Sequence, residues 1–365
     1  MTSETLVTVD CRMLDSSGIG TYIRSVVPRI VRLRPEWRFA LIGPEVRMRD
    51  IDWASSSNVT VVPCAVPIYG IREQFAVLRC IPQGTNLFWS PHYNIPVLYQ
   101  GNMLVTVHDV LHLAMPQYAK GVLKQTYARA MFRAVRHRAR AVICVSDFTV
   151  AELQRLTPPS PQIVRRIYNG VDDNWFQVSE TLSPHARPYL VYVGNVKPHK
   201  NLRTLLDAFG RVKDNIAEDL IIAGKREGFI TGDDNISEYA RDLGERVMFT
   251  GYVSDNLLHQ YVAHATALVF PSLYEGFGLP AVEAMAAGCP VLASNAASIP
   301  EVCGDAALYC DARNPDDLAT GILRIAQDAE LRETLRQRGR QRARMFSWNT
   351  CAEGTVNVML EVLER

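Results

Sequence analysis

Short apolar runs alternate along the chain with longer stretches in which apolar residues recur every three or four positions. A short run bounded by polar or glycine residues predicts a buried strand, and the longer spacing predicts a helix. Strands are expected at residues 6–11, 39–42, 59–62, 87–89, 103–107, 141–145, 163–167, 189–193, 219–223, 246–250, 267–270, 289–293 and 306–310. Strands and helices that alternate in this way favour parallel sheets covered by helices on both faces.

Helices are expected between these strands, at residues 21–33, 72–79, 120–140, 147–156, from 201 onward, and at 235–243, 255–264, 281–287, 314–327 and 329–345. A chain of 365 residues is long for one hydrophobic core and suits two domains. A polar stretch after residue 172 indicates the boundary. The sequence therefore predicts domains over 1–172 and 173–348, followed by a C-terminal helix over 349–365.

One stretch near the middle of the second half combines a strand, a glycine-containing loop and a helix. Gly276 and Gly278 allow the loop to turn sharply and its backbone to approach a ligand closely. Pro280 suits the first position of a helix, and Gly288 suits its end. Such a helix N-terminus predicts an anion site, because its unpaired N–H groups and the helix dipole both point at it.

Two glutamates flank this predicted anion site. Glu275 lies in the loop, and Glu283 lies inside the helix. Carboxylates repel a phosphate because both are negatively charged, but they accept hydrogen bonds from hydroxyl groups. A ligand with a central diphosphate and a hydroxyl-bearing sugar at each end fits both features, which predicts a nucleotide-sugar. The alternative is that one glutamate caps the helix and the other lies on its surface.

Composition and charge narrow the class of protein. The apolar and charged fractions are ordinary for a globular protein, and the net charge is +1. The eight cysteines form no CxxC pair, so reduced core cysteines of a cytoplasmic protein are expected. No secretion signal or membrane-spanning run is apparent. Basic residues predominate in 1–186 and acidic ones in 187–365, which points to an anionic partner for the first half.

The segment PSLYEGFGLPAVEAMAAGCPV resembles the signature of retaining glycosyltransferases of family 4, which have the GT-B fold. The resemblance covers nearly the whole chain. It implies an α/β protein with two Rossmann-like, doubly wound parallel-sheet domains that face each other across a cleft, and a C-terminal helix that crosses back onto the first domain. It implies that Glu275 lies against the donor sugar and Glu283 binds the ribose. The loop residues expected to bind the donor are Gly276, Phe277, Gly278 and Leu279.

A second glycine segment follows the first predicted strand. Gly18 and Gly20 form a G-x-G pattern, but Ile23 stands where the third glycine of the dinucleotide-binding fingerprint would be. A nicotinamide oxidoreductase, which needs that fingerprint, is therefore disfavoured. The family resemblance implies that Gly18 and Gly20 lie over the donor diphosphate at the cleft. A plain tight turn is the alternative.

Lysines of the second half are candidates for the diphosphate. Lys200 follows a strand-ending glycine at a helix start, where an ammonium group would neutralise the charge of a leaving phosphate. Lys225 is a second candidate, with an exposed turn lysine as the alternative. The family also has a basic residue directly after the glycine. Asn195 occupies that place here, and whether Lys197 replaces the missing charge stays open.

His108 and Asp109 directly follow a predicted buried strand, where polar side chains face the ligand crevice of an α/β sheet. The family often has a histidine there, close to acceptor and donor sugar. We therefore expect His108 to be catalytic together with Glu275 and Lys200, and Asp109 to lie on the acceptor side. The alternative is a histidine whose ring is satisfied by a backbone carbonyl. His92 and His112 are weaker candidates that are more often structural.

The predicted helix over 120–140 carries seven basic residues and no acidic one beside an apolar stripe. Such a helix suits an anionic membrane surface. The alternative is a solvated charged face. Nucleic acid binding is disfavoured, because no aromatic residues are interleaved with the charges and the whole chain is near neutral.

Together these features predict a metal-independent glycosyltransferase that needs no cofactor besides its nucleotide-sugar. No Asp-x-Asp motif closes a strand, and no carboxylate is placed as a nucleophile, which favours same-face attack with retention. The GxGxY, HD and GxxxPxKN segments resemble those of bacterial mannosyltransferases of polysaccharide assembly. That resemblance implies GDP-mannose as donor, a glycan or lipid-linked acceptor, and a cytoplasmic protein at the inner membrane. UDP- or dTDP-sugars, or a catalytically silent scaffold subunit, are the alternatives.

Overall fold

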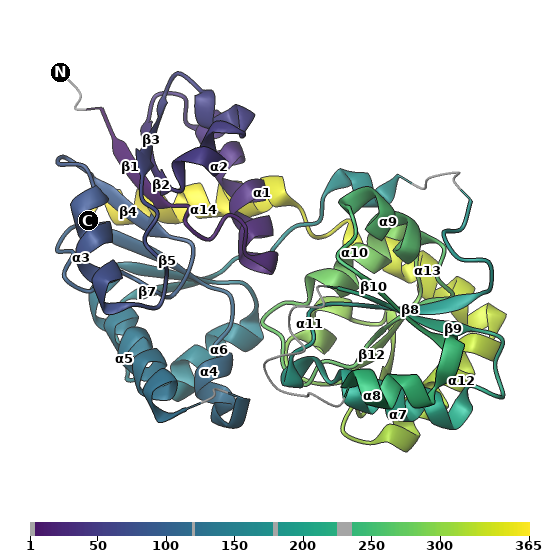
Figure 1. Ribbon diagram of the computed structural model, residues 1–365. Coiled ribbons are helices and arrows are strands. Elements are labelled where there is room, and N and C mark those ends of the chain that lie inside the picture. The colour runs from purple at the N-terminus through teal and green to yellow at the C-terminus, as the bar shows by residue number, and fades with distance from the viewer. Residues whose placement is uncertain (1–3, 119–120, 178–181, 225–235) are drawn as a thin grey trace. The chain divides into compact units, whose positions relative to one another are not determined.

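The computed structural model describes residues 4–118, 121–177, 182–224 and 236–365. The chain forms two compact units, which are drawn in Figure 1. Unit 1 contains residues up to Gly170 together with Ser347–Arg365, and unit 2 contains Val171–Phe346. The chain therefore leaves unit 1 once and returns to it for its last helix. None of the helices in the described parts is both long and apolar enough to cross a membrane.

Unit 1 is built on a parallel sheet that, among the described residues, has seven strands in the order β3-β2-β1-β4-β5-β6-β7. The strands between the two edges are mostly buried, because they are near-continuous apolar runs covered on both faces, while the edge strands β3 and β7 are partly exposed. The strands of this sheet are β1 (Leu6–Asp10), β2 (Arg38–Gly43), β3 (Val59–Pro63), β4 (Leu87–Ser90), β5 (Met103–Val107), β6 (Ala141–Cys144) and β7 (Ile163–Arg166).

Helices cover both faces of this sheet (Figure 1). They are α1 (Ser17–Leu33), α2 (Glu45–Arg49), α3 (Ile71–Cys80), α4 (Leu111–Ala114), α5 (Val122–Arg138), α6 (Asp147–Leu156) and α14 (Trp348–Leu363). Helix α14 packs along α1 and against β4, β5 and β6. Gly170 permits this return, because a Cβ there would lie 2.1 Å from the backbone nitrogen of Trp348. The expected crossing of the last helix onto the first unit is confirmed.

Unit 2 repeats the architecture with a parallel sheet that has six strands among the described residues, in the order β10-β9-β8-β11-β12-β13. The strands are β8 (Tyr189–Val193), β9 (Asp219–Ala223), β10 (Val247–Gly251), β11 (Ala267–Phe270), β12 (Val291–Ser294) and β13 (Ala307–Cys310). The helices are α7 (Leu202–Val212), α8 (Ile236–Asp242), α9 (Asp255–Ala263), α10 (Leu279–Ala287), α11 (Ile299–Cys303), α12 (Pro315–Gln327) and α13 (Ala329–Ala343).

In both sheets, the strands that follow the first one are added on one side of it, and the later strands are added on its other side. In unit 1 the reversal separates β1 from β4, and in unit 2 it separates β8 from β11. Loops that leave the carboxyl ends of such a strand pair diverge to opposite faces and open a crevice, which is where doubly wound sheets bind ligands. The expected pair of Rossmann-like parallel sheets is confirmed, and each contains one such switch point.

Helix α1 differs from its prediction. It begins at Ser17 and not near Thr21, so Gly18 and Gly20 form its first turn. Glycine is a poor helix former, which is why the sequence suggested a loop. Gly20 is required by packing, because a Cβ there would lie 2.3 Å from the carbonyl oxygen of Leu14.

Candidate active site

The switch point of unit 2 brings together two predicted site residues that lie far apart in the sequence. Lys200 ends a short 3₁₀ helix, Pro198–Lys200, which follows β8. Glu275 lies in the loop after β11. Because β8 and β11 are parallel neighbours, their carboxyl ends lie at the same edge of the sheet. The fold thus explains why these side chains meet.

Lys200 and Glu275 form an ion pair, with 2.5 Å between Nζ and Oε1. The two side chains are only 19% and 11% exposed. Lys200 Nζ also lies 5.9 Å from the centre of the Phe270 ring. Burial, and then the charge of Glu275, raise the pKa of the neighbouring Tyr192 phenol. Glu275 does not cap α10, because this helix begins after Gly278 without a side-chain cap.

The loops around this ion pair are held by hydrogen bonds from Asn201 and Ser298. Asn201 Nδ2 donates to the carbonyl oxygens of Pro271 (3.2 Å) and Ala312 (2.6 Å). Its backbone is left-handed, with φ 60°, a conformation that Asn adopts more readily than most residues. Ser298 Oγ donates to the carbonyl oxygen of Glu275 at 2.9 Å. These bonds fix the backbones that carry both charged side chains.

Helix α10 points its N-terminus into the same loop. Gly278 precedes it with φ 99°, a conformation that favours glycine. The Gly278 carbonyl accepts from Ala281 N at 3.0 Å, so the helical bonding begins directly after the glycine. The first turn carries no acidic residue. This end of α10 therefore presents positive dipole charge suited to an anion. Phe277 is buried and packs edge-on against Phe346 at 5.4 Å.

Glu283 lies one turn into α10 and is half-buried. Its pKa is raised to about 8, first by loss of water and then by the negative charges of Asp172 and Asp255. The raised pKa favours the protonated carboxyl group when no ligand is bound. The rings of Trp175 and His259 pack against each other in the same region, tilted by 40° with ring centres 3.8 Å apart.

His108 and Asp109 follow β5 in unit 1, as expected, but both have local partners. His108 Nε2 lies 3.0 Å from the carbonyl oxygen of Pro91. A carbonyl can only accept, so Nε2 carries the proton and Nδ1 is an acceptor. Burial lowers the pKa of His108. Asp109 Oδ1 accepts from Leu111 N at 2.9 Å, at the start of α4. The alternative prediction, a histidine satisfied by a backbone carbonyl, thus holds for Nε2 of His108.

His92 and His112 also have local partners. Burial, followed by the charges of His108, His112 and Arg12, lowers the pKa of His92 to about 3. Its Nδ1 accepts from the backbone nitrogen of Asn94 at 3.1 Å. His112 Nδ1 lies 3.2 Å from the hydroxyl oxygen of Tyr93.

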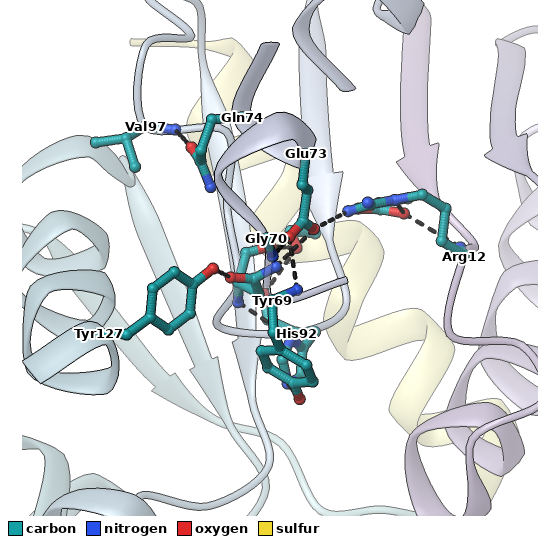
Figure 2. A network of polar contacts seen from close by, with 11 residues as sticks. Arg12, Tyr69, Gly70, Glu73, Gln74, His92, Val97 and Tyr127 are labelled. Atoms are coloured by element: carbon teal, nitrogen blue, oxygen red, sulfur yellow. Dashed lines mark hydrogen bonds and ion pairs between the residues drawn. The ribbon is translucent and has the colours of Figure 1, made fainter. Parts of the chain in front are cut away.

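Sequence reasoning missed a buried polar network at the switch point of unit 1, which Figure 2 shows. Its centre is Arg12, two residues after the end of β1, with Glu73 from α3 and Asn94 from the segment after β4. Arg12 Nη2 lies 2.6 Å from Asp10 and 2.7 Å from Glu73. The only local signal was an acid, Asp10, that ends an otherwise apolar strand.

Three predictions concern lysines and the basic helix. Lys225 lies outside the described residues. Lys197 is exposed and Asn195 is half-buried in the loop after β8. Two of the basic side chains of α5 bind within unit 1 and do not contribute to a solvent-facing basic surface. Arg136 Nη1 donates to Gln162 (2.6 Å), and Arg138 Nε donates to the Val97 carbonyl (3.0 Å). Within the described parts of the chain, no three His, Cys, Asp or Glu side chains cluster to hold a metal ion.

Two family models match the chain. One, described as glycosyl transferases group 1, covers residues 173–342, and the other, glycosyltransferase family 4, covers 71–175. Together with the relatives below, these matches show that the chain belongs to the family 4 glycosyltransferases with the GT-B fold.

The relatives named here extend over most of the chain. The O-antigen chain mannosyltransferase B of Escherichia coli is 31% identical over 93% of this chain and 95% of its own length. The MMP alpha-(1->4)-mannosyltransferase of Mycolicibacterium hassiacum is 30% identical over 81% of this chain and 73% of its own. The solved sucrose-phosphate synthase of Thermosynechococcus elongatus covers 99% of this chain and 100% of its own with a TM-score of 0.79. At 21% identity, that last likeness concerns the fold alone.

Proposed function

We propose that the chain transfers a mannosyl or related residue from a GDP-sugar onto a glycan or lipid-linked acceptor, with retention at the anomeric carbon. The bond between C1 and the phosphate oxygen breaks, and its electron pair stays on the phosphate. The acceptor oxygen bonds to C1 from the same face. The acceptor proton passes to the leaving phosphate, which acts as the base.

The observation that carries this proposal is the ion pair of Lys200 and Glu275 beside the N-terminus of α10. A leaving diphosphate needs positive charge, and Lys200 together with the α10 dipole supplies it. Glu275 accepts hydrogen bonds from hydroxyls of the transferred sugar and is thereby placed close to C1. We assign both residues to catalysis.

Further donor contacts follow from the same loop. The backbone amides of 276–279 bind the diphosphate, and Glu283 accepts from the ribose hydroxyls. The remaining donor residues of the proposal are Gly18, Gly20 and Lys225. His108 and Asp109 lie on the side of the acceptor substrate. Nδ1 of the neutral His108 ring can accept a hydrogen bond from a substrate hydroxyl. Asp109 stabilises the loop that follows through its bond to Leu111 N.

The choice of mannose rests on the relatives, two of which are named as mannosyltransferases. A UDP- or dTDP-sugar is the competing donor. A catalytically silent scaffold is the competing class, and it is disfavoured because Lys200, Glu275 and both loop glycines are retained. We propose further that catalysis needs no metal ion and no cofactor, since Lys200 and the α10 dipole would supply the positive charge that the diphosphate needs.

Peripheral attachment to the inner face of a membrane is part of the proposal. The start of α5 exposes Val122 (77%) and Leu123 (86%) beside Lys124. Apolar side chains next to basic ones suit an anionic lipid surface. Sedimentation with phosphatidylglycerol vesicles tests this. A double change of Val122 and Leu123 to serine should abolish binding, and binding that survives it would refute the assignment.

Hydrolysis and transfer assays with a panel of GDP-, UDP- and dTDP-sugars test the function. We expect turnover with GDP-mannose and its loss in Glu275→Ala and Lys200→Ala. The matched control is Lys213→Ala, which removes a half-buried lysine that pairs with Asp214 at the end of α7. Full turnover in both site variants would refute the assignment of Lys200 and Glu275 to catalysis. Turnover only with a UDP- or dTDP-sugar would refute the GDP-sugar as donor.

A further inference from the structure

A small pocket lies at the switch point of unit 1 and is lined by residues of that unit. Its wall includes Asp10 at the end of β1 and Arg12 after it, Pro91 and His92 after β4, and Ile68 before α3. Strands β1 and β4 are parallel neighbours whose loops diverge here. The pocket thus occupies the position where a doubly wound sheet binds ligands.

Arg12 in this wall has an unused donor. Its side chain is 3% exposed, and it is held by Asp10 through Nε (2.9 Å) and Nη2 (2.6 Å) and by Glu73 through Nη2 (2.7 Å). Nη1 is buried and has no hydrogen-bond partner among the described residues. A buried guanidinium nitrogen without a partner is costly, so it calls for an acceptor atom in the pocket.

The carboxylate opposite Arg12 is fully occupied. Glu73 Oε1 accepts from Arg12 and from Asn94 Nδ2 (2.6 Å), and Oε2 accepts from the backbone nitrogens of Tyr69 (2.8 Å) and Gly70 (3.4 Å). The network is drawn in Figure 2. Two carboxylates face one guanidinium, so the local charge is negative. This charge disfavours an anionic group at Nη1 and favours a neutral hydroxyl.

Tyr69 lies next to the pocket in a strained backbone conformation. Its φ is 69°, which is uncommon for an aromatic residue, and the bond from its N–H to Glu73 holds it there. The residue is 47% exposed, while its hydroxyl oxygen lies 3.3 Å from Nε2 of the pocket residue His92. A large aromatic face is therefore fixed at the surface beside a buried polar group.

We propose that Arg12 and Tyr69 form a subsite for one uncharged sugar unit of the acceptor. A sugar hydroxyl accepts a hydrogen bond from Arg12 Nη1 in the pocket, and the apolar face of the same sugar packs on the Tyr69 ring. Aromatic faces combined with few buried polar groups are the usual composition of ligand sites. This inference rests on the proposed function, because it takes the bound sugar to be part of the acceptor substrate. It adds that the recognised sugar is uncharged.

Variants at the pocket rim test the subsite without breaking the buried ion pairs, which Arg12→Met would do. Ile68→Trp fills the pocket, and Tyr69→Gly removes the ring while relieving the positive φ. Phe75→Ala is the matched control, because Phe75 is an exposed aromatic of α3 at 52%. The probes are octyl α-mannoside as a neutral acceptor and its 6-phosphate as an anionic one. The readouts are acceptor KM, donor hydrolysis without acceptor, and saturation-transfer NMR of each probe.

Ile68→Trp and Tyr69→Gly should each raise KM for octyl mannoside by at least about tenfold, with acceptor-free hydrolysis within about twofold of wild type. Phe75→Ala should change neither, and the phosphorylated probe should bind more weakly to wild type. An unchanged KM in both variants would mean that the pocket holds water only. Equal binding of both probes would refute the charge argument. If wild type hydrolysed no donor, the proposed function would fail, and the NMR comparison alone would decide the subsite.

Discussion

Nζ of Lys200 lies 2.5 Å from Oε1 of Glu275, although 75 positions separate the two residues in the sequence. Without a donor, the two proposed catalytic charges neutralise each other. In the proposed function, a diphosphate that binds Lys200 competes with Glu275 and releases the carboxylate to accept from the sugar. On that proposal the ion pair is the resting arrangement, and donor binding opens it.

The first prediction follows from this competition. Glu275→Gln should lower the rate of transfer by about 10²-fold or more, because the amide accepts more weakly at the sugar. Nucleoside diphosphate affinity should hold or improve, because Lys200 no longer has a competing anion. Calorimetry with GDP and steady-state rates check both parts. Lys200→Met should lower both rate and affinity, and the double variant should lose less than the product of the single losses. Independent, multiplicative losses would show that the residues do not act as a unit.

The second prediction concerns Glu283, whose pKa of about 8 exceeds the ordinary value of a glutamate. Between the unfolded value, about 4.3, and about 8, the folded state holds a proton that the unfolded state has lost. The free energy of unfolding should therefore fall as pH rises through this window. Urea unfolding at about pH 5.5 and about pH 8.5 should show a larger fall for wild type than for Glu283→Gln. Parallel falls would refute the raised pKa.

A third prediction concerns Gly278, whose φ of 99° precedes α10. Gly278→Ala should destabilise the protein by about 1–2 kcal/mol, because an L side chain is strained in this region. It should also weaken GDP binding, since the amides that follow would shift. Gly70→Ala is the control: φ is −123° there, and a Cβ would meet nothing within 4 Å. Thermal unfolding and calorimetry of both variants check this, and equal shifts would contradict it.

A fourth prediction treats Asn201 as a positioning residue. Asn201→Asp keeps a residue that tolerates φ 60° but replaces the Nδ2 donor, so the carbonyls of Pro271 and Ala312 would face a negative oxygen. We expect the rate of transfer to fall by at least about tenfold, with a smaller effect in Asn201→Gly. A crystal structure of Asn201→Asp should show a longer distance between Lys200 and Glu275. An intact ion pair with a lowered rate would exclude positioning as the cause.

The fifth prediction is that EDTA leaves the rate of transfer unchanged. Lys200 and the N-terminus of α10 would carry the leaving-group charge that a divalent cation carries in other transferases. Assays after dialysis against EDTA, with and without added magnesium, test this. A rate that collapses in EDTA and returns with magnesium would rule out the metal-independent mechanism.

Much of the fold was readable from apolar spacing. The strands Met103–Val107, Tyr189–Val193 and Asp219–Ala223 have the predicted bounds, because a strand buried on both faces is a nearly continuous apolar run. Short helices were missed: α2 and α4 span too few residues to show a period. The start of α1 was misplaced, because Gly20 is chosen for its contact with Leu14 and not for helix propensity.

The candidate site residues of unit 2 could be named from the sequence because they lie in one motif or in the loop that follows a predicted strand. Glu275 and Lys200 were named from the sequence, but their ion pair was not, since it depends on β8 and β11 being neighbours. Arg12 and Glu73 escaped for the same reason. They lie 61 positions apart and share no motif, so only the packing of α3 near the end of β1 brings them together.

Helix α14 belongs to unit 1 but follows all of unit 2 in the chain. During synthesis the sheet of unit 1 leaves the ribosome early, yet the surface over β4, β5 and β6 waits for residues 348–363. Unit 2 is complete before that surface is covered. The apolar face of unit 1 that α14 covers therefore stays open until residues 348–363 have been synthesised, and packing of α14 completes that unit.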